Sequence, residues 1–307
     1  MSLLISIIGS GRVGSAIAFL AAATSLDDIQ LVNRSKDKAI GQALDISNAI
    51  PKESSFSVTS TDFSGIKNSE VVVISASTGT YVTSRTEMIS EQIIMIKDIA
   101  KKVKRFAPNS KILIVSNPVD VLNYIFLKET EISRNRVIGV ASSLDSSRFR
   151  YLLSQELNVN ASEIKNALVL GEHGDSMVPI FSVTKCNNKP VLDILSSSQL
   201  DKITKDVRNY WQVLRKFKGP SIFGIAKNTV DVLGTIIKNE ELSIPASVML
   251  DGEYGLSDVC LGVPVKITKD GLTEIQEITL NRYEKNSLCQ SAATVRKYLL
   301  TEMSQIT

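Results

Sequence analysis

Near its amino terminus the chain reads LLISIIGSGRVG, residues 3–14. Residues 3–8 are almost entirely apolar, which is typical of a strand buried on both faces of a parallel sheet. A helix of small residues follows at 15–23, and a second apolar strand at 29–32. The order strand, G-x-G-x-x-G, helix, strand within about 30 residues indicates a dinucleotide-binding fold.

Each glycine of this turn has a separate physical task. Gly9 permits the tight turn, Gly11 lets a pyrophosphate approach the backbone, and Gly14 lets the helix pack close to the strand. The free N–H groups at the helix start then receive the phosphates. We therefore expect the cofactor to be bound by these glycines and by the first helical residues, Arg12 and Val13.

The end of the second strand bears on the choice of cofactor. NAD-binding proteins usually carry Asp or Glu there, which accepts hydrogen bonds from the ribose hydroxyls. This chain instead has Asn33-Arg34-Ser35. A guanidinium and a hydroxyl suit a 2′-phosphate, which favours NADP, or use of both cofactors, over NAD alone. The alternative is an Asn33 that still binds ribose while Arg34 points at solvent.

Strands and helices alternate over the first 140 residues. The apolar runs predict strands at 56–59, 71–74, 112–115 and 136–140, separated by helices at 36–49, 86–106 and 119–127. This alternation predicts an α/β fold of the Rossmann type, with a doubly wound parallel sheet. Ligands lie outside the carboxyl ends of such strands, so 75–85 and 116–120 are expected to face one crevice.

From about Ser142 the pattern becomes mixed. Helices are predicted at 144–157, 198–217, 222–237 and 281–303, with strands at 167–170, 178–183, 244–250 and 263–267. We therefore predict a dinucleotide-binding domain at 1–141 and a second, α+β catalytic or substrate lobe at 142–307.

Composition excludes several classes of partner. The 307 residues carry 35 Lys plus Arg against 32 Asp plus Glu, a net charge of +3 without a basic stripe, so no nucleic-acid partner is expected. The three cysteines lie far apart, which argues against a disulfide framework and a metal site. No run is long enough for a membrane span, and residues 3–8 lead into the glycine turn rather than a cleavage site. A cytoplasmic protein without a membrane partner is the expectation.

The second lobe holds the one histidine of the chain. His173 follows the apolar run 167–170 within Gly171-Glu172-His173-Gly174-Asp175. The flanking glycines allow a sharp turn, and an imidazole has an ordinary pKa suited to proton transfer near neutral pH. Taken alone, the pentapeptide fits a turn-capping histidine equally well. Asp145 and Arg148, spaced i and i+3, share one helix face.

Five segments of the chain, in order, resemble the lactate/malate dehydrogenase family. They are IGSGRVG (8–14), SNPVD (116–120), LDSSRFRYLL (144–153), GEHGDSMVP (171–179) and KGPSIFGIA (218–226). The resemblance covers nearly the whole chain and favours a catalytic role for His173 over a turn-capping one. It implies an NAD(P)-dependent 2-hydroxy acid dehydrogenase that forms a homodimer or homotetramer. A dinucleotide-binding protein without catalysis is the alternative of another class.

The resemblance also implies roles for individual residues. His173 would be the proton donor and acceptor, and Asp145 would hold its other ring nitrogen. Arg148 would bind the substrate carboxylate, and Arg85 would lie on a loop that closes over the reacting carbon. Asn117 and Ser221 would also line the substrate site. Asn117 would contact the cofactor as well.

Gly79 departs from the family pattern. Malate enzymes of the family carry an additional Arg six residues before the closing Arg, lactate enzymes usually carry Gln, and this chain has neither. A dicarboxylate would bury a charge without its usual partner, which is costly. The malate-like Met177-Val178-Pro179 favours malate/oxaloacetate slightly over lactate/pyruvate, and a bulkier 2-oxo acid stays open.

Overall fold

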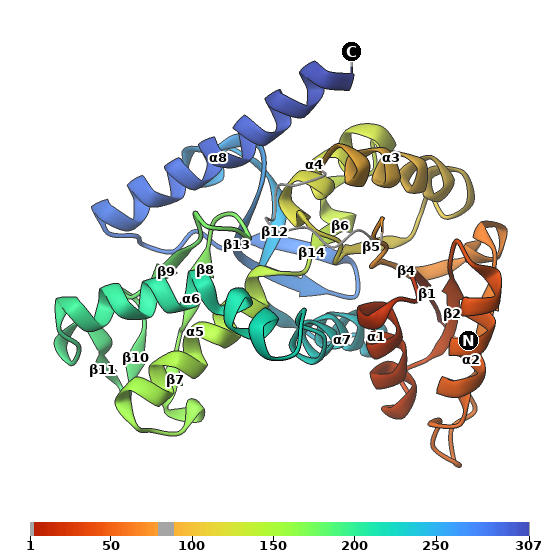
Figure 1. Ribbon diagram of the computed structural model, residues 1–307, viewed down its shortest axis with the longest axis horizontal. Coiled ribbons are helices and arrows are strands. Elements are labelled where there is room, and N and C mark those ends of the chain that lie inside the picture. The colour runs from red at the N-terminus through yellow and green to blue at the C-terminus, as the bar shows by residue number, and fades with distance from the viewer. Residues whose placement is uncertain (1–2, 79–88, 307) are drawn as a thin grey trace. The chain divides into compact units, whose positions relative to one another are not determined.

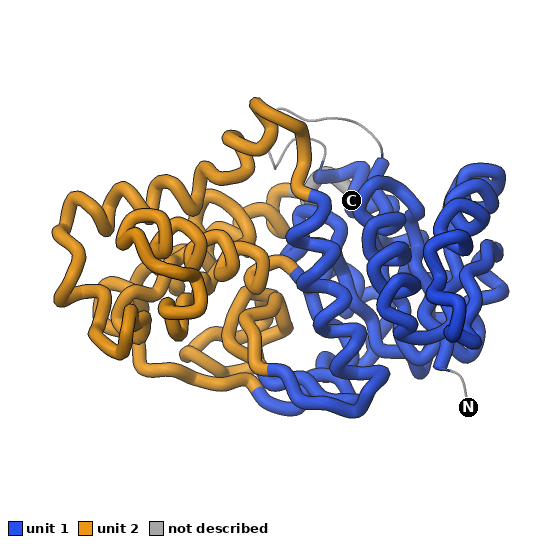
Figure 2. The backbone as a smooth tube through the Cα atoms, turned by 90° about the horizontal axis from the view of Figure 1, so that it is seen from below, with its two compact units in different colours: residues 1–140, 222–242, 266–274 blue, residues 141–221, 243–265, 275–307 orange. Residues whose placement is uncertain are grey.

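The computed structural model describes residues 3–78 and 89–306 of the chain. Their contacts divide the chain into two compact units, coloured separately in Figure 2. Unit 1 comprises residues 1–140, 222–242 and 266–274, and unit 2 comprises residues 141–221, 243–265 and 275–307.

Unit 1 is built on parallel strands in the order β3-β2-β1-β4-β5-β6. Ile7 of β1 is paired with Leu31 on one side and Val73 on the other, and all three side chains are fully buried. Both faces are covered, which explains the unbroken apolar runs. The strands are β1 (Leu4–Ile8), β2 (Asp28–Val32), β3 (Val58–Thr61), β4 (Ser69–Ile74), β5 (Lys111–Ile114) and β6 (Val137–Gly139).

Helices cover both faces of this sheet, which confirms the doubly wound fold. In Figure 1, α3 and α4 lie on one side of the strands and α1 and α7 on the other. α3 packs against α4, and α1 packs against α7 and α2. The helices are α1 (Arg12–Ala23), α2 (Lys36–Ser47), α3 (Ile89–Phe106), α4 (Val119–Thr130) and α7 (Phe223–Lys238).

The division differs from the expected single boundary near residue 142. The first break does fall between Val140 and Ala141, but the segments 222–242 and 266–274 are counted with unit 1. The reason is packing: α7 lies against α1, and a Cβ built on Gly234 would touch Leu26. Local periodicity predicts that 222–237 is a helix but contains no information on which core the helix joins.

Unit 2 has its own core, in which α5 (Ser142–Leu157) and α6 (Ser197–Phe217) pack together. Phe149 and Leu153 of α5 meet Ile203 and Val207 of α6 there, and Phe149 makes an edge-to-face contact with Phe181. The remaining elements are the short strands β7 (Ile164–Lys165), β8 (Leu168–Leu170), β9 (Val178–Ile180), β10 (Lys185–Cys186) and β11 (Lys189–Pro190), and the helix α8 (Arg282–Ile306).

Several strands were incompletely predicted or missed. β9 ends at Ile180 rather than at residue 183, because a turn closes there: the Thr184 hydroxyl donates to the Ile180 carbonyl and the Thr184 N–H to that of Phe181. β12 (Leu242–Asp251) and β13 (Ser257–Thr268) are longer than expected, and β14 (Gly271–Ile275) had no prediction. Each of these last three has residues in both units.

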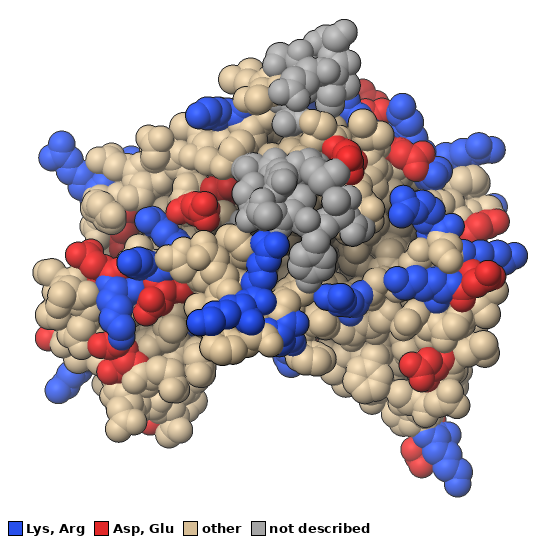
Figure 3. All heavy atoms as spheres, viewed as in Figure 1, with Lys and Arg blue, Asp and Glu red and all other residues tan. Residues whose placement is uncertain are grey.

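The surface carries both signs of charge. On the face shown in Figure 3, Lys and Arg side chains are interspersed with Asp and Glu. Within 3–78 and 89–306, no helix combines the length and the apolar character needed to cross a membrane.

Candidate active site

The glycine turn between β1 and α1 is tightly packed at two of its three glycines. Gly9 has φ of +102°, and a Cβ there would lie 2.6 Å from backbone atoms of Ala76. A Cβ on Gly14 would lie 2.0 Å from the Gly9 carbonyl oxygen and 2.5 Å from the Ser75 hydroxyl. That hydroxyl donates to the Gly9 carbonyl at 2.8 Å, which closes the turn against β4. The protein's own packing therefore requires glycine at both positions.

Gly11 is different, because a Cβ there would meet no protein atom within 4 Å. It is the N-cap of α1, with φ of −79°, and no side chain caps the helix start. The open space and the uncapped N–H groups fit a pyrophosphate that approaches the backbone. Residues 9–14 thus suit a dinucleotide, as the sequence predicts.

Two alanine substitutions separate these tasks. Gly14→Ala is expected to destabilise the protein by about 1–3 kcal/mol, because the methyl group overlaps the Gly9 carbonyl. Gly11→Ala is expected to leave the unfolding temperature of the cofactor-free protein unchanged but to weaken cofactor binding. Thermal unfolding and cofactor titration measure both effects. A Gly11→Ala protein with wild-type cofactor affinity would contradict the assigned role of Gly11.

The segment after β2 lies next to this turn. Asn33 Nδ2 donates to the Ser10 hydroxyl at 2.8 Å, and Asn33 Oδ1 accepts from the Ser35 N–H at 3.0 Å. Arg34 and Ser35 are exposed, and the Ser35 side chain does not cap α2. Asn33 is therefore hydrogen-bonded to the glycine turn through Ser10, whereas the Arg34 side chain is exposed.

The carboxyl ends of β4 and β5 meet at the edge expected from the strand order. The Ser116 hydroxyl donates to the Ala76 carbonyl at 2.6 Å, and the Ser116 N–H donates to that of Ile74 at 3.2 Å. Asn117 follows directly, is exposed and precedes a cis peptide bond to Pro118. Asn117 thus lies at the carboxyl end of β5, the edge at which sheets of this type bind ligands.

In unit 2, one carboxylate links the two groups expected to carry the chemistry. Asp145 Oδ2 lies 2.5 Å from His173 Nδ1, and Asp145 Oδ1 accepts from Arg148 Nη1 at 3.0 Å. The exposed fractions of the three side chains are 1% for Asp145, 7% for Arg148 and 8% for His173. Charges this deeply buried are tolerated because they are paired.

This contact determines which nitrogen of His173 carries a proton in the neutral ring. A carboxylate accepts hydrogen bonds, so Nδ1 is the donor and Nε2 carries the lone pair. The Asp145–Arg148 bond uses one of the five guanidinium N–H groups, and a two-point grip on a carboxylate needs two of the other four. The cluster can therefore accept a proton at Nε2 beside a carboxylate-binding cation.

The histidine loop, residues 171–177, is held at both ends. Gly171 exchanges backbone hydrogen bonds with Gly262 at 2.8 and 3.0 Å, and the Glu172 N–H donates to the Ser291 hydroxyl of α8 at 2.7 Å. The Ser176 hydroxyl donates to the Glu172 carboxylate. Gly171 has φ of +91°, and a Cβ there would lie 2.6 Å from the Ser291 hydroxyl, so only glycine fits.

Carboxylates near the loop also act on α8. Burial raises the pKa of the Tyr298 hydroxyl, and the negative charges of Glu172 and Asp175 raise it further. Tyr298 therefore stays neutral through the physiological pH range.

Helix α6 supplies two contacts that sequence reasoning missed. Arg208 donates twice to the Met177 carbonyl, and the Tyr210 ring lies against the Arg148 guanidinium. Neither residue belongs to a recognisable motif, and no local pattern indicates a contact with a residue more than 30 positions away.

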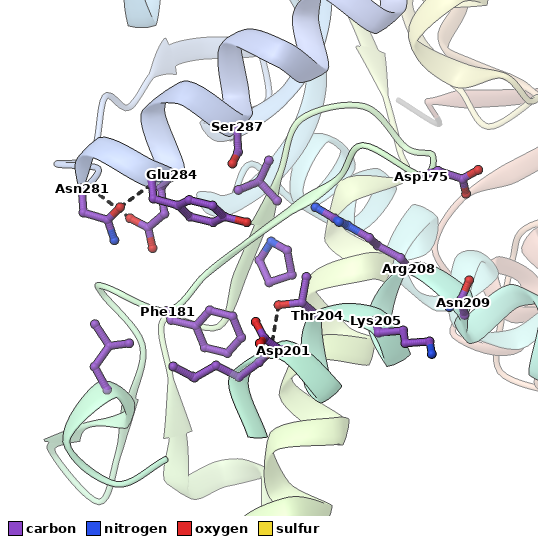
Figure 4. A pocket seen from close by; sticks show the side chains of 15 residues that line it. Asp175, Phe181, Asp201, Thr204, Lys205, Arg208, Asn209, Asn281, Glu284 and Ser287 are labelled. Atoms are coloured by element: carbon purple, nitrogen blue, oxygen red, sulfur yellow. Dashed lines mark hydrogen bonds between the residues drawn. The ribbon is translucent and has the colours of Figure 1, made fainter. Parts of the chain in front are cut away.

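A cavity of about 510 Å³ opens beside this helix, with the side chains shown in Figure 4. Its apolar wall includes Phe181, and Asp175, Asp201 and Arg208 supply charge. Its lining does not include Asp145, Arg148 or His173, so within the described part of the chain it is separate from their cluster.

The other predicted site residues have different outcomes. Gly79 and Arg85 lie outside the described residues. Ser221 is half-buried in the last segment of unit 2 before α7, and its contact with substrate stays a prediction.

A parallel sheet with a glycine turn for a dinucleotide, and a buried His-Asp-Arg cluster, define the class of nicotinamide-dependent dehydrogenases. The two halves of the chain match the two domains of a single enzyme family. Residues 3–139 match the NAD binding domain of lactate/malate dehydrogenase, and residues 142–305 match its alpha/beta C-terminal domain. The chain belongs to the lactate/malate dehydrogenase family and is an NAD-dependent 2-hydroxy acid dehydrogenase, which confirms the sequence-based assignment at this level.

Individual relatives are divided between the two activities. The chain is 36% identical to the malate dehydrogenase of Pelagibacter ubique over 304 residues (95% of this chain, 94% of the relative). It is 33% identical to L-lactate dehydrogenase 1 of Listeria monocytogenes over 308 residues (98% of each). The lactate dehydrogenase of Cryptosporidium parvum, solved with lactic acid and β-nicotinamide adenine dinucleotide, superimposes with a TM-score of 0.94 at 30% identity, covering 98% of each chain.

Proposed function

We propose that this enzyme oxidises malate to oxaloacetate, with lactate/pyruvate as the second candidate. The observation that carries the mechanism is Asp145, whose two oxygens contact His173 and Arg148. A 2-hydroxy acid has a hydroxyl that must lose a proton and a carboxylate that must be held. His173 and Arg148 match these two needs.

In the proposed mechanism, Arg148 binds the substrate carboxylate through two N–H groups and orients the hydroxyl. His173 accepts the hydroxyl proton at Nε2, and Asp145 stabilises the resulting imidazolium. A bound nicotinamide supplies the hydride acceptor. Residues Gly9, Gly11 and Gly14 and the start of α1 would hold its pyrophosphate. In the reductive direction, His173 returns the proton to the 2-oxo oxygen.

The malate proposal is supported by Met177-Val178-Pro179 and by relatives such as the P. ubique enzyme. Lactate is supported by Gly79, which supplies no cation for a second carboxylate, and by relatives such as the L. monocytogenes enzyme. Initial rates with oxaloacetate and pyruvate decide between them, and we expect the higher kcat/KM with oxaloacetate. A higher kcat/KM with pyruvate would replace the malate proposal. In either case, Gly79→Arg is expected to raise the ratio of kcat/KM for oxaloacetate to that for pyruvate, because it supplies the cation that malate enzymes of the family carry at this position.

We also propose that the enzyme accepts NADP beside NAD. The support is the absence of an acidic side chain in the segment Asn33-Arg34-Ser35, with Arg34 exposed beside the uncapped start of α2. We expect kcat/KM for NADPH within about tenfold of that for NADH, a difference of about 1.4 kcal/mol. Asn33→Asp should lower NADPH use selectively, because a carboxylate repels the 2′-phosphate. A preference for NADH by several orders of magnitude would overturn this proposal.

A further inference from the structure

Helix α6 is firmly attached to the helix that carries Asp145 and Arg148. A capping box between Ser196 and Gln199 fixes its start. Ile203 and Val207 are 1% exposed and lie in the same core as Phe149 of α5. Side chains projecting from α6 toward the cluster are therefore presented by a rigid support.

The first such side chain is Tyr210. The Arg148 Cζ lies 5.2 Å from the centroid of the Tyr210 ring, within range of a cation–π contact. Asp145 accepts a hydrogen bond from the same guanidinium at 3.0 Å. The guanidinium is thus held by the carboxylate and by the ring, and an arginine fixed in this way binds a planar carboxylate without first losing side-chain entropy.

The second side chain is Arg208. Its Nε and Nη2 both donate to the Met177 carbonyl oxygen, at 3.1 and 3.0 Å. Met177 is fully buried and closes a turn with Gly174, the residue after His173, through a backbone hydrogen bond of 3.4 Å. Arg208 therefore fixes the carboxyl end of the histidine loop, as Gly262 and Ser291 fix its beginning.

We propose that α6 is a positioning element for the reaction, in which Tyr210 orients the carboxylate-binding Arg148 and Arg208 orients the loop that carries His173. This inference rests on the proposed function. The two residues act on different steps, because the first affects substrate binding and the second affects proton transfer. Both residues act indirectly, Tyr210 through the Arg148 guanidinium and Arg208 through the Met177 carbonyl.

Steady-state kinetics of two variants test the proposal. Tyr210→Leu should raise KM for the preferred 2-oxo acid about two- to thirtyfold, the range of a cation–π contact, with kcat and its pH profile unchanged. Arg208→Met should lower kcat about ten- to hundredfold, the effect of a small misplacement of a reacting group, and shift the pH profile of kcat/KM. Its KM should stay near the wild-type value.

The controls separate positioning from folding. Lys205→Met removes an exposed cation one turn before Arg208 on the same helix and should leave both constants unchanged. Tyr210→Phe keeps the ring and should restore KM, and Arg208→Lys keeps one donor and should restore part of kcat. All rates are measured well below the unfolding temperature of each variant. Equal changes of kcat and KM in both variants, or no change in either, would overturn the proposal.

A binding measurement distinguishes failure of this inference from failure of the proposed function. Oxamate, an unreactive isostere of pyruvate, can be titrated in the presence of NADH while the fluorescence of the chain's single tryptophan, Trp211, is followed. Weaker oxamate binding by Tyr210→Leu than by wild type supports the role of Tyr210 even if no 2-oxo acid is turned over. Equal affinity in an active enzyme overturns that role and leaves the dehydrogenase function intact.

Discussion

His173→Ala is expected to lower kcat by about two to four orders of magnitude, the usual contribution of a general acid–base group. No second histidine exists in the chain to replace it, and Asp145, only 1% exposed, cannot take its place at the substrate. Cofactor binding should remain near the wild-type value, because residues 9–14 belong to unit 1. Stopped-flow or steady-state rates, together with NADH titration, measure the two quantities.

A matched control comes from α5. Ser147→Ala removes a hydroxyl whose hydrogen bond, to the Ser143 carbonyl at 2.9 Å, stays within the helix, and it should leave kcat unchanged. A His173→Ala enzyme with wild-type kcat would exclude His173 as the proton-transferring residue. Loss of both kcat and NADH binding would indicate unfolding instead, and thermal unfolding would show it.

Asp145→Asn is expected to affect both kcat and KM, unlike any other substitution proposed here. The amide keeps the shape but removes the charge shared by His173 and Arg148. The imidazolium loses its stabilising carboxylate and Arg148 is left buried with a weaker partner, so kcat/KM should fall by about two to four orders of magnitude. Loss of a partner from a buried pair should also lower stability by about 3–5 kcal/mol.

Glu156→Gln is the comparison for this variant. Glu156 is also an acid on α5, but it pairs with Lys202 at the surface, where ion pairs contribute little. Lys202 and Gln199 lower the pKa of the Glu156 carboxyl, so this surface contribution is present near neutral pH and is lost as pH falls through the lowered pKa. The kcat and KM of the Glu156→Gln enzyme should equal those of the wild type. If Asp145→Asn retained wild-type kcat and KM, the shared-carboxylate mechanism would be wrong.

Much of unit 1 could be predicted from the sequence. The runs 3–8 and 71–74 are apolar because both sheet faces are covered, and G-x-G-x-x-G marks a turn where two glycines have no room for a Cβ. Such features are local, so they are visible in a single sequence. β3 was placed two residues early, since strand ends are set by hydrogen-bond partners rather than by composition.

The sequence predicted which residues form the candidate site, but it did not predict how they are arranged. Helical spacing places Asp145 and Arg148 on one face, and flanking glycines mark His173, but the 2.5 Å contact joins residues 28 positions apart. Arg208 and Tyr210 were missed altogether, because α6 looks like an ordinary amphipathic helix. Long-range contacts of this kind leave no periodic signal.

The sequence by itself determined the α/β class, the nucleotide-binding turn and the family, because all three depend on residue order within short segments. Only the tertiary structure decided that α7 packs in unit 1, that one carboxylate serves both His173 and Arg148, and that α6 supports them. Those outcomes depend on which surfaces are buried against each other. Burial is a property of the folded chain, since it brings together side chains that are distant in sequence.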